Sequence, residues 1–147
     1  MPSKNLEALV KVAELTEIIT FELSVKRVEI PKTEPKNPPK QVPVRPNYSL
    51  TTATLPDGSG FLIRLAVTIE LPIGQISCDL GAAYKLKSGL DFTLDSSTLI
   101  EYSNEVAVMT LLPFVRQSVA DLSQRSWGFP LLMPVMPRGA LQFLSNP

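Results

Sequence analysis

The chain has 147 residues, of which 44% are hydrophobic and 19% are charged, and its 14 basic and 14 acidic side chains leave no formal net charge. The charge balance argues against binding to nucleic acid or to an anionic membrane, and no apolar run is long enough to insert across a membrane. The apolar content indicates extra burial in an oligomer or at a binding surface. The sequence contains no histidine, which excludes Ser-His-Asp and Cys-His catalysis and histidine-ligated zinc.

The first 30 residues predict a helix followed by a strand. Apolar residues recur at helical spacing up to residue 15 and at a period of two from Ile19, the repeats that distinguish a helix from a half-buried strand. The helix is therefore predicted over residues 1–15. Because the next apolar pair, Val28 and Ile30, is out of phase with the strand, we expect a bulge near Lys26 and Arg27. One face of the strand is expected to carry Ile19, Phe21, Leu23 and Val25.

Residues 31–46 are rich in proline. Proline removes backbone donors and favours extended structure, so this stretch is predicted to be a long crossover connection and not a central strand. Two roles stay open for it. A solvated spacer is favoured, and a recognition arm is the alternative.

Three strands joined by short turns are predicted next, over residues 48–55, 61–71 and 76–86. Proline and glycine at 56–60 and 72–74 supply the reversals, so the three form an antiparallel meander. One face of the middle strand carries Phe61, Ile63, Leu65, Val67, Ile69 and Leu71. The corresponding face of the last strand carries Ile76, Cys78, Leu80, Ala82, Tyr84 and Leu86.

A long helix is predicted after the meander. Thr98 and Glu101 fit a capping box, with Asp95 near the helix start. Pro113 is expected to kink the helix or to divide it. The apolar stripe consists of Val108, Leu112, Val115, Val119 and Leu122, and it predicts that the helix covers the sheet. The fold class is therefore α+β: a four-stranded antiparallel sheet covered by a long kinked helix, in a single domain over residues 1–147.

Few residues are suited to catalysis. Asp91, Asp95 and Glu101 are candidates for two-carboxylate chemistry, but helix caps and solvated charges are the favoured interpretation. We predict that the chain is not an enzyme and has no metal or cofactor. Cys78 is the only cysteine, and charged residues interrupt the apolar ones near the N-terminus, so a reducing, cytoplasmic setting without a signal peptide is expected.

The segment that follows the helix stays hydrophobic but loses the helical period, with Trp127, Phe129, Leu132 and Met133 lying among prolines. The segment is either packed against its own domain or exposed as an apolar binding surface. Its pattern, which runs from Leu112-Pro113-Phe114 through Phe129-Pro130 to Ala140-Leu141, resembles the C-terminal signature of the SecB export-chaperone family. The stretches "RLAVTIE" and "SCDLGAAY" resemble the third and fourth strands of that family. The N-terminal helix is more similar to SecB-like chaperones associated with toxin–antitoxin systems.

The resemblance implies an ATP-independent holdase that binds unfolded or precursor polypeptides, as a homotetramer built from two dimers. Delivery to the SecA motor of the export machinery is one implied role, and service to a specific partner such as an antitoxin is the alternative. Matching the family's residues implies three groups. The client-binding groove would comprise Tyr48, Leu50, Thr52, Trp127, Phe129, Leu132 and Met133. The oligomer interface would comprise Cys78, Leu80, Ala82 and Tyr84, and Asp79 and Glu29 would face SecA. Because an acidic C-terminal tail is missing, we expect weak or absent binding to SecA.

Overall fold

The computed structural model describes residues 3–28, 45–133, 136–137 and 139–144. Most of the proline-rich connection predicted over 31–46 therefore lies outside the described residues. The elements, in chain order, are α1 (Lys4–Val12), β1 (Ala13–Arg27), β2 (Asn47–Thr54), β3 (Gly60–Leu71), β4 (Gly74–Leu86), α2 (Ser96–Tyr102), the π-helical turn η1 (Ser103–Ala107) and α3 (Val108–Trp127).

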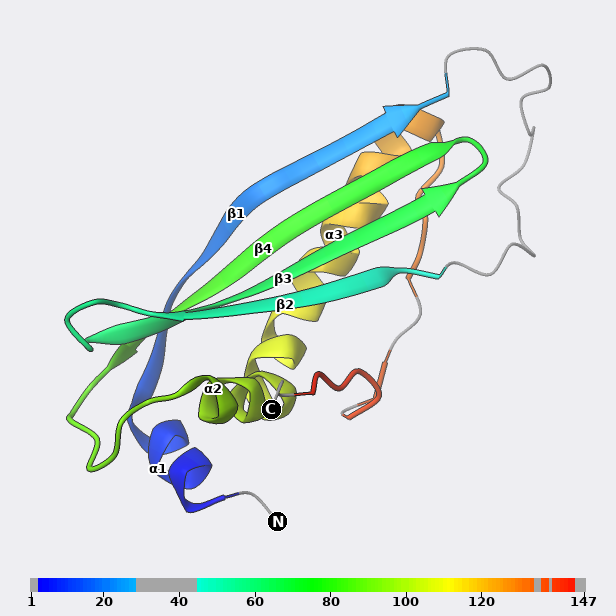
Figure 1. The fold of residues 1–147 in the computed structure, drawn as a ribbon. Helices are drawn as coiled ribbons and strands as arrows, with labels where there is room; N and C mark the ends of the chain where they lie inside the picture. The colour runs from blue at the N-terminus through cyan, green and yellow to red at the C-terminus, as the bar shows by residue number, and fades with distance from the viewer. Residues whose placement is uncertain (1–2, 29–44, 134–135, 138, 145–147) are drawn as a thin grey trace.

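The strands form one antiparallel sheet in the order β1-β4-β3-β2, so β1 and β2 are its edges. The long helix α3 lies across one face of this sheet (Figure 1). The predicted fold class, a four-stranded antiparallel sheet under a long helix, is confirmed. No helix in the described part of the chain combines the length and the apolar content that crossing a membrane requires.

The core forms between the sheet and α3, as the alternation in the two central strands predicted. On β3, Phe61, Ile63, Leu65, Val67 and Ile69 are all buried, and so are their β4 neighbours from Ile76 to Tyr84 on the same face. The expected stripe of α3 meets them, with Val108, Leu112, Val115 and Val119 buried and Leu122 half-buried. Two patterns of different period therefore enclose one apolar layer.

The prediction for β1 is wrong in two respects. The strand begins directly after α1, at Ala13, and its bulges lie between Leu15 and Glu17 and between Thr20 and Glu22, not near Lys26. Each bulge inserts one unpaired residue and reverses which side chains face the core. Leu23 and Val25 therefore face α3, since they oppose the buried Cys78 and Ile76, whereas Ile19 opposes Gly81 on the outer face.

Phe21, the unpaired residue of the second bulge, also lies on the outer face of the sheet. A Cβ added at Gly81 would come within 2.7 Å of its ring. The Arg64 guanidinium lies 3.8 Å above the same ring, in a cation–π contact. The four apolar residues that the period of two assigned to one face of β1 are thus divided between two faces.

The helical region differs from expectation at the predicted capping box, and at Pro113 the predicted division of the helix does not occur. Asp95 caps α2 by accepting a hydrogen bond from the backbone N–H of Thr98 (2.9 Å), and this bond lowers the pKa of Asp95. Glu101 does not complete a capping box, because its carboxylate accepts from the backbone N–H and the hydroxyl of Ser3 (both 2.9 Å). It thereby joins the start of α1 to α2. The helix does not divide at Pro113, which lies inside the continuous α3, and the irregular turn is η1, upstream.

Burial of three groups makes stability sensitive to alkaline pH. Burial raises the pKa of Cys78 to about 11, with a further contribution from Glu22, and burial also raises the pKa of Tyr84 and Tyr102. Since each group ionises first in the unfolded chain, the free energy of unfolding is expected to fall as the pH rises from about 9 to about 11. Denaturant titrations across this range will measure the slope. Cys78→Ala should make this slope shallower, because unfolding then releases up to one proton fewer. An unchanged slope would show that the Cys78 thiol does not cause the pH dependence.

Candidate functional site

The strand half of the expected groove lies on the edge strand β2. Tyr48, Leu50 and Thr52 oppose Val67, Leu65 and Ile63 in the pairing with β3, so all three face the side of the sheet that α3 covers. They are half-buried, whereas their β3 partners are fully buried, and Tyr48 and Leu50 pack against the core. Burial raises the pKa of Tyr48. This edge therefore presents apolar side chains that the chain itself covers only in part.

The loop half begins where α3 ends. Gly128 closes the helix in a left-handed conformation (φ 84°), and its N–H donates to the carbonyl of Gln124 (3.2 Å). Glycine suits this position because other residues avoid positive φ. The chain then turns back along the helix, so the residues that follow the glycine stay on the helix side of the sheet (Figure 1).

A buried serine fixes the returning chain. The hydroxyl of Ser123 accepts a hydrogen bond from the backbone N–H of Leu131 (2.6 Å) and donates to the carbonyl of Val119 (2.8 Å). Ser123 is fully buried, and a buried hydroxyl with both functions satisfied is a stable junction. The sequence prediction missed this residue, although a polar residue following Val115 and Val119 on the apolar stripe is a visible signal.

The loop divides its apolar residues between core and solvent. Leu131 and Met133 point inward, and Met133 is only 4% exposed, whereas Leu132 is 75% exposed. Trp127 and Phe129 are half-buried, and their ring centroids lie 6.4 Å apart. Of the four residues predicted from the loop, three therefore present surface, and Met133 belongs to the core of the described chain.

The residues predicted for an oligomer interface all face α3. Cys78, Leu80, Ala82 and Tyr84 are buried within the single chain, on β4, which is a central strand. Their arrangement is that of an ordinary core strand, which the alternation also allowed. A charged substitution at Cys78 or Leu80 would therefore disturb the core and could not report on assembly. The subunit interface stays a prediction.

The predicted SecA-facing residues are differently placed. Asp79 lies on the outer face of the sheet, where its carboxylate accepts from Arg64 through Nε–Oδ1 (3.3 Å) and Nη2–Oδ2 (2.5 Å). Arg64 in turn covers Phe21. Asp79 is thus paired within the chain. Glu29 lies outside the described residues.

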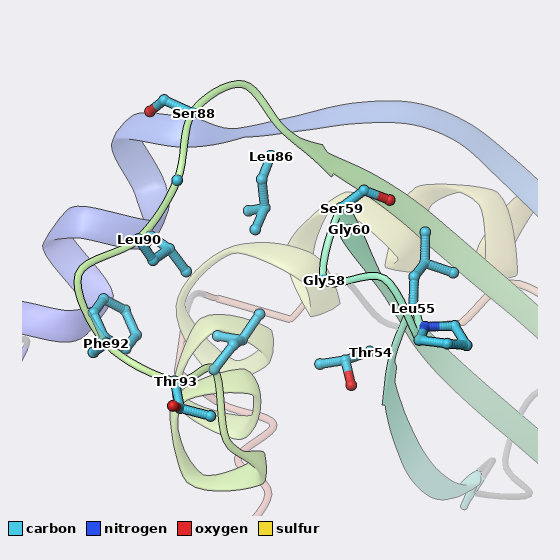
Figure 2. A pocket seen from close by; sticks show the side chains of 13 residues that line it. Thr54, Leu55, Gly58, Ser59, Gly60, Leu86, Ser88, Leu90, Phe92 and Thr93 are labelled. Atoms are coloured by element: carbon cyan, nitrogen blue, oxygen red, sulfur yellow. The ribbon is translucent and has the colours of Figure 1, made fainter.

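The structure also contains a hollow that sequence reasoning missed. It has a volume of about 590 Å³ and lies between the β2–β3 turn and the segment leading to α2 (Figure 2). Leu55, Leu86, Leu90 and Phe92 supply apolar surface around it. This hollow lies at the end of the sheet opposite to the C-terminal end of α3 (Figure 1), so it is separate from the loop described above.

Two of the three carboxylates considered for catalysis make structural contacts. Asp95 caps α2 and Glu101 binds Ser3, while Asp91 is exposed in the segment before α2. No group of three or more histidine, cysteine, aspartate or glutamate side chains with the arrangement of a metal site occurs among the described residues.

Comparisons with known proteins agree with this arrangement. No protein-family model matches the sequence. The chain is 27% identical over 134 residues to the SecB-like chaperone SmegB of Mycolicibacterium smegmatis. The aligned region covers 91% of this chain and 80% of SmegB. The structure of this chain is similar to that of the Mycobacterium tuberculosis Rv1957 SecB-like chaperone, which was solved in complex with a ChAD peptide from the Rv1956 HigA1 antitoxin. The TM-score is 0.74 at 17% sequence identity, and the superposition covers 92% of this chain and 99% of the Rv1957 chain. The resemblance to SecB-like chaperones is confirmed.

Proposed function

We propose that the chain is an ATP-independent chaperone that holds an extended, non-native segment of a dedicated partner, such as an antitoxin. The segment would bind on the helix side of the edge strand β2 and against the loop that follows α3. In this proposal Tyr48 and Leu50 supply the strand side and Trp127, Phe129 and Leu132 the loop side. A cytosolic setting and assembly into a dimer of dimers belong to the same proposal.

The observation that carries the proposal is the loop after α3. The contact of Ser123 with Leu131 fixes the backbone, and yet Leu132 projects into solvent with three quarters of its surface exposed. Trp127 and Phe129, which are half-buried with ring centroids 6.4 Å apart, lie in the same segment. A group of apolar side chains left partly exposed in one place is typical of a surface that a partner covers. Apolar contact is non-directional, so such a surface accepts segments of differing sequence.

The comparisons favour a dedicated partner over general export. The relative SmegB is described as a SecB-like chaperone, and the similar structure of Rv1957 was solved with a peptide from an antitoxin. Export would add docking to SecA. In this chain Asp79, the described acidic candidate for that docking, is already paired with Arg64, so we expect SecA to bind weakly or not at all.

A client panel tests the proposal. The purified protein would be titrated, without nucleotide, with peptides that together span an antitoxin encoded beside its gene, and with several unrelated unfolded proteins. A dedicated chaperone binds the antitoxin peptide and protects the unrelated proteins poorly, whereas a general holdase protects all of them alike. Binding to none of these clients would contradict both versions.

Leu132→Ser tests the site within the same assay. In the proposed complex the client buries Leu132. Losing that burial removes roughly 1.5–3 kcal/mol of apolar stabilisation, so client affinity is expected to fall about tenfold or more. Val10→Ser is the matched control, because Val10 is an exposed aliphatic residue on α1 (48%), away from the loop. Thermal unfolding would show that both variants keep the fold. If the two variants bound the client equally well, Leu132 would lie outside the site.

A further inference from the structure

The C-terminal segment of the chain, residues 139–144, is held by a side-chain amide. Asn104 Nδ2 donates to the carbonyl of Phe143 (2.8 Å), and the backbone N–H of Phe143 donates to Asn104 Oδ1 (2.7 Å). The amide thus satisfies both backbone groups of one residue, as a neighbouring strand would. Figure 1 shows the segment, in red, beside α2 and the start of α3.

Burial alternates over residues 140–144, after a turn and bends at residues 139–141. Leu141 and Phe143 are half-buried and pack against the core, whereas Gln142 is exposed and Leu144 is 88% exposed. Alternate burial is the pattern of an extended peptide seated on a surface. The segment therefore has the form of a bound apolar peptide that is covalently attached to its own binding surface.

Asn104 forms its hydrogen bonds with the backbone of Phe143 and not with the side chain. It lies in the π-helical turn η1, between α2 and α3, and such wide turns occur often at functional sites. A contact with one backbone N–H and one backbone carbonyl accepts any residue except proline, which has no N–H. The two hydrogen bonds of Asn104 therefore place no requirement on the side chain of the bound residue.

We propose that Asn104 anchors a subsite for extended apolar peptides and that residues 139–144 occupy this subsite until a client segment displaces them. The proposal rests on the chaperone function proposed above, because the displacing peptide is a client. A tethered occupant acts at a high effective concentration, so it weakens client binding and keeps apolar surface covered when no client is present.

Two substitutions separate the anchor from the occupant. Phe143→Pro removes the N–H that Asn104 accepts from, so it frees the segment and leaves the anchor intact. Asn104→Ala frees the segment as well, but it also removes the anchor. The probe is a synthetic peptide with the sequence of residues 139–147, fluorescently labelled and added to the full-length protein.

We expect Phe143→Pro to bind this peptide about tenfold more tightly than the parent, since competition by the tethered segment is lost. Asn104→Ala should bind it no better than the parent. Leu144→Pro is the control, because proline at 144 keeps residue 143 extended and leaves its N–H in place. Circular dichroism would establish that each variant is folded.

A second measurement needs no variant. A peptide carrying proline at the position of Phe143 should bind the parent protein markedly more weakly than the original peptide. Equal affinity for the two peptides, or tighter binding by Asn104→Ala than by the parent, would overturn the proposal. If the peptide binds as expected while no antitoxin peptide or unfolded protein does, the subsite stands and the proposed chaperone function fails.

Discussion

Phe61→Ala is expected to lower the free energy of unfolding by about 3–5 kcal/mol, among the largest losses for a single truncation in this chain. Phe61 is 1% exposed, stacks on Tyr84 with ring centroids 4.9 Å apart, and meets the edge of Tyr102 at 5.3 Å. The three rings join β3, β4 and α2. Removing the Phe61 ring therefore leaves a cavity and also breaks two aromatic contacts, each worth about 0.5–1.5 kcal/mol beyond burial.

Chemical denaturation followed by circular dichroism measures this loss. Phe114→Ala is the matched control, because Phe114 is 43% exposed on α3, and the same change there should cost less than about 1 kcal/mol. Phe61→Leu, which leaves a smaller cavity, is expected to lose less than Phe61→Ala and serves if the alanine variant does not fold. Similar losses for Phe61→Ala and Phe114→Ala would show that the aromatic cluster does not stabilise the junction.

Ser123→Ala is expected to lower the free energy of unfolding by about 2 kcal/mol and to loosen the loop after α3. The substitution removes the acceptor of the Leu131 N–H and the donor to Val119. Leaving a buried backbone N–H without a partner costs about 1–3 kcal/mol. Client affinity should fall as well, because a loop that is no longer fixed must be ordered when the client binds.

Hydrogen exchange at the Leu131 amide reports directly on this contact, and it should become much faster in the variant. Ser118→Ala is the control: Ser118 is half-buried on the same helix, and alanine favours helix, so stability should stay the same or rise slightly. Unchanged exchange at Leu131 in Ser123→Ala would mean that the inward packing of Leu131 and Met133 holds the loop without the serine.

The local elements could be predicted from the sequence wherever one period continued without interruption. From Phe61 to Leu86 the alternation fixed the strands, their turns and the buried face, and the stripe from Val108 to Leu122 fixed the covering helix. These patterns suffice because each side chain's face follows from its position along the chain alone. The resemblance carried by the residues after Leu112 and by the strands added the chaperone interpretation, which the comparisons support.

Only the tertiary structure decided the contacts between distant residues. The two bulges of β1 place Phe21 on the outer face, and they are set by pairing with β4, which no local period reveals. Glu101 binds Ser3 across 98 positions, and Asn104 binds Phe143 across 39. Neighbouring apolar residues also separated, since Leu132 is exposed and Met133 is buried. The sequence shows that the loop is rich in apolar residues. The direction of each side chain, however, depends on the backbone, which the hydrogen bond between Ser123 and Leu131 fixes.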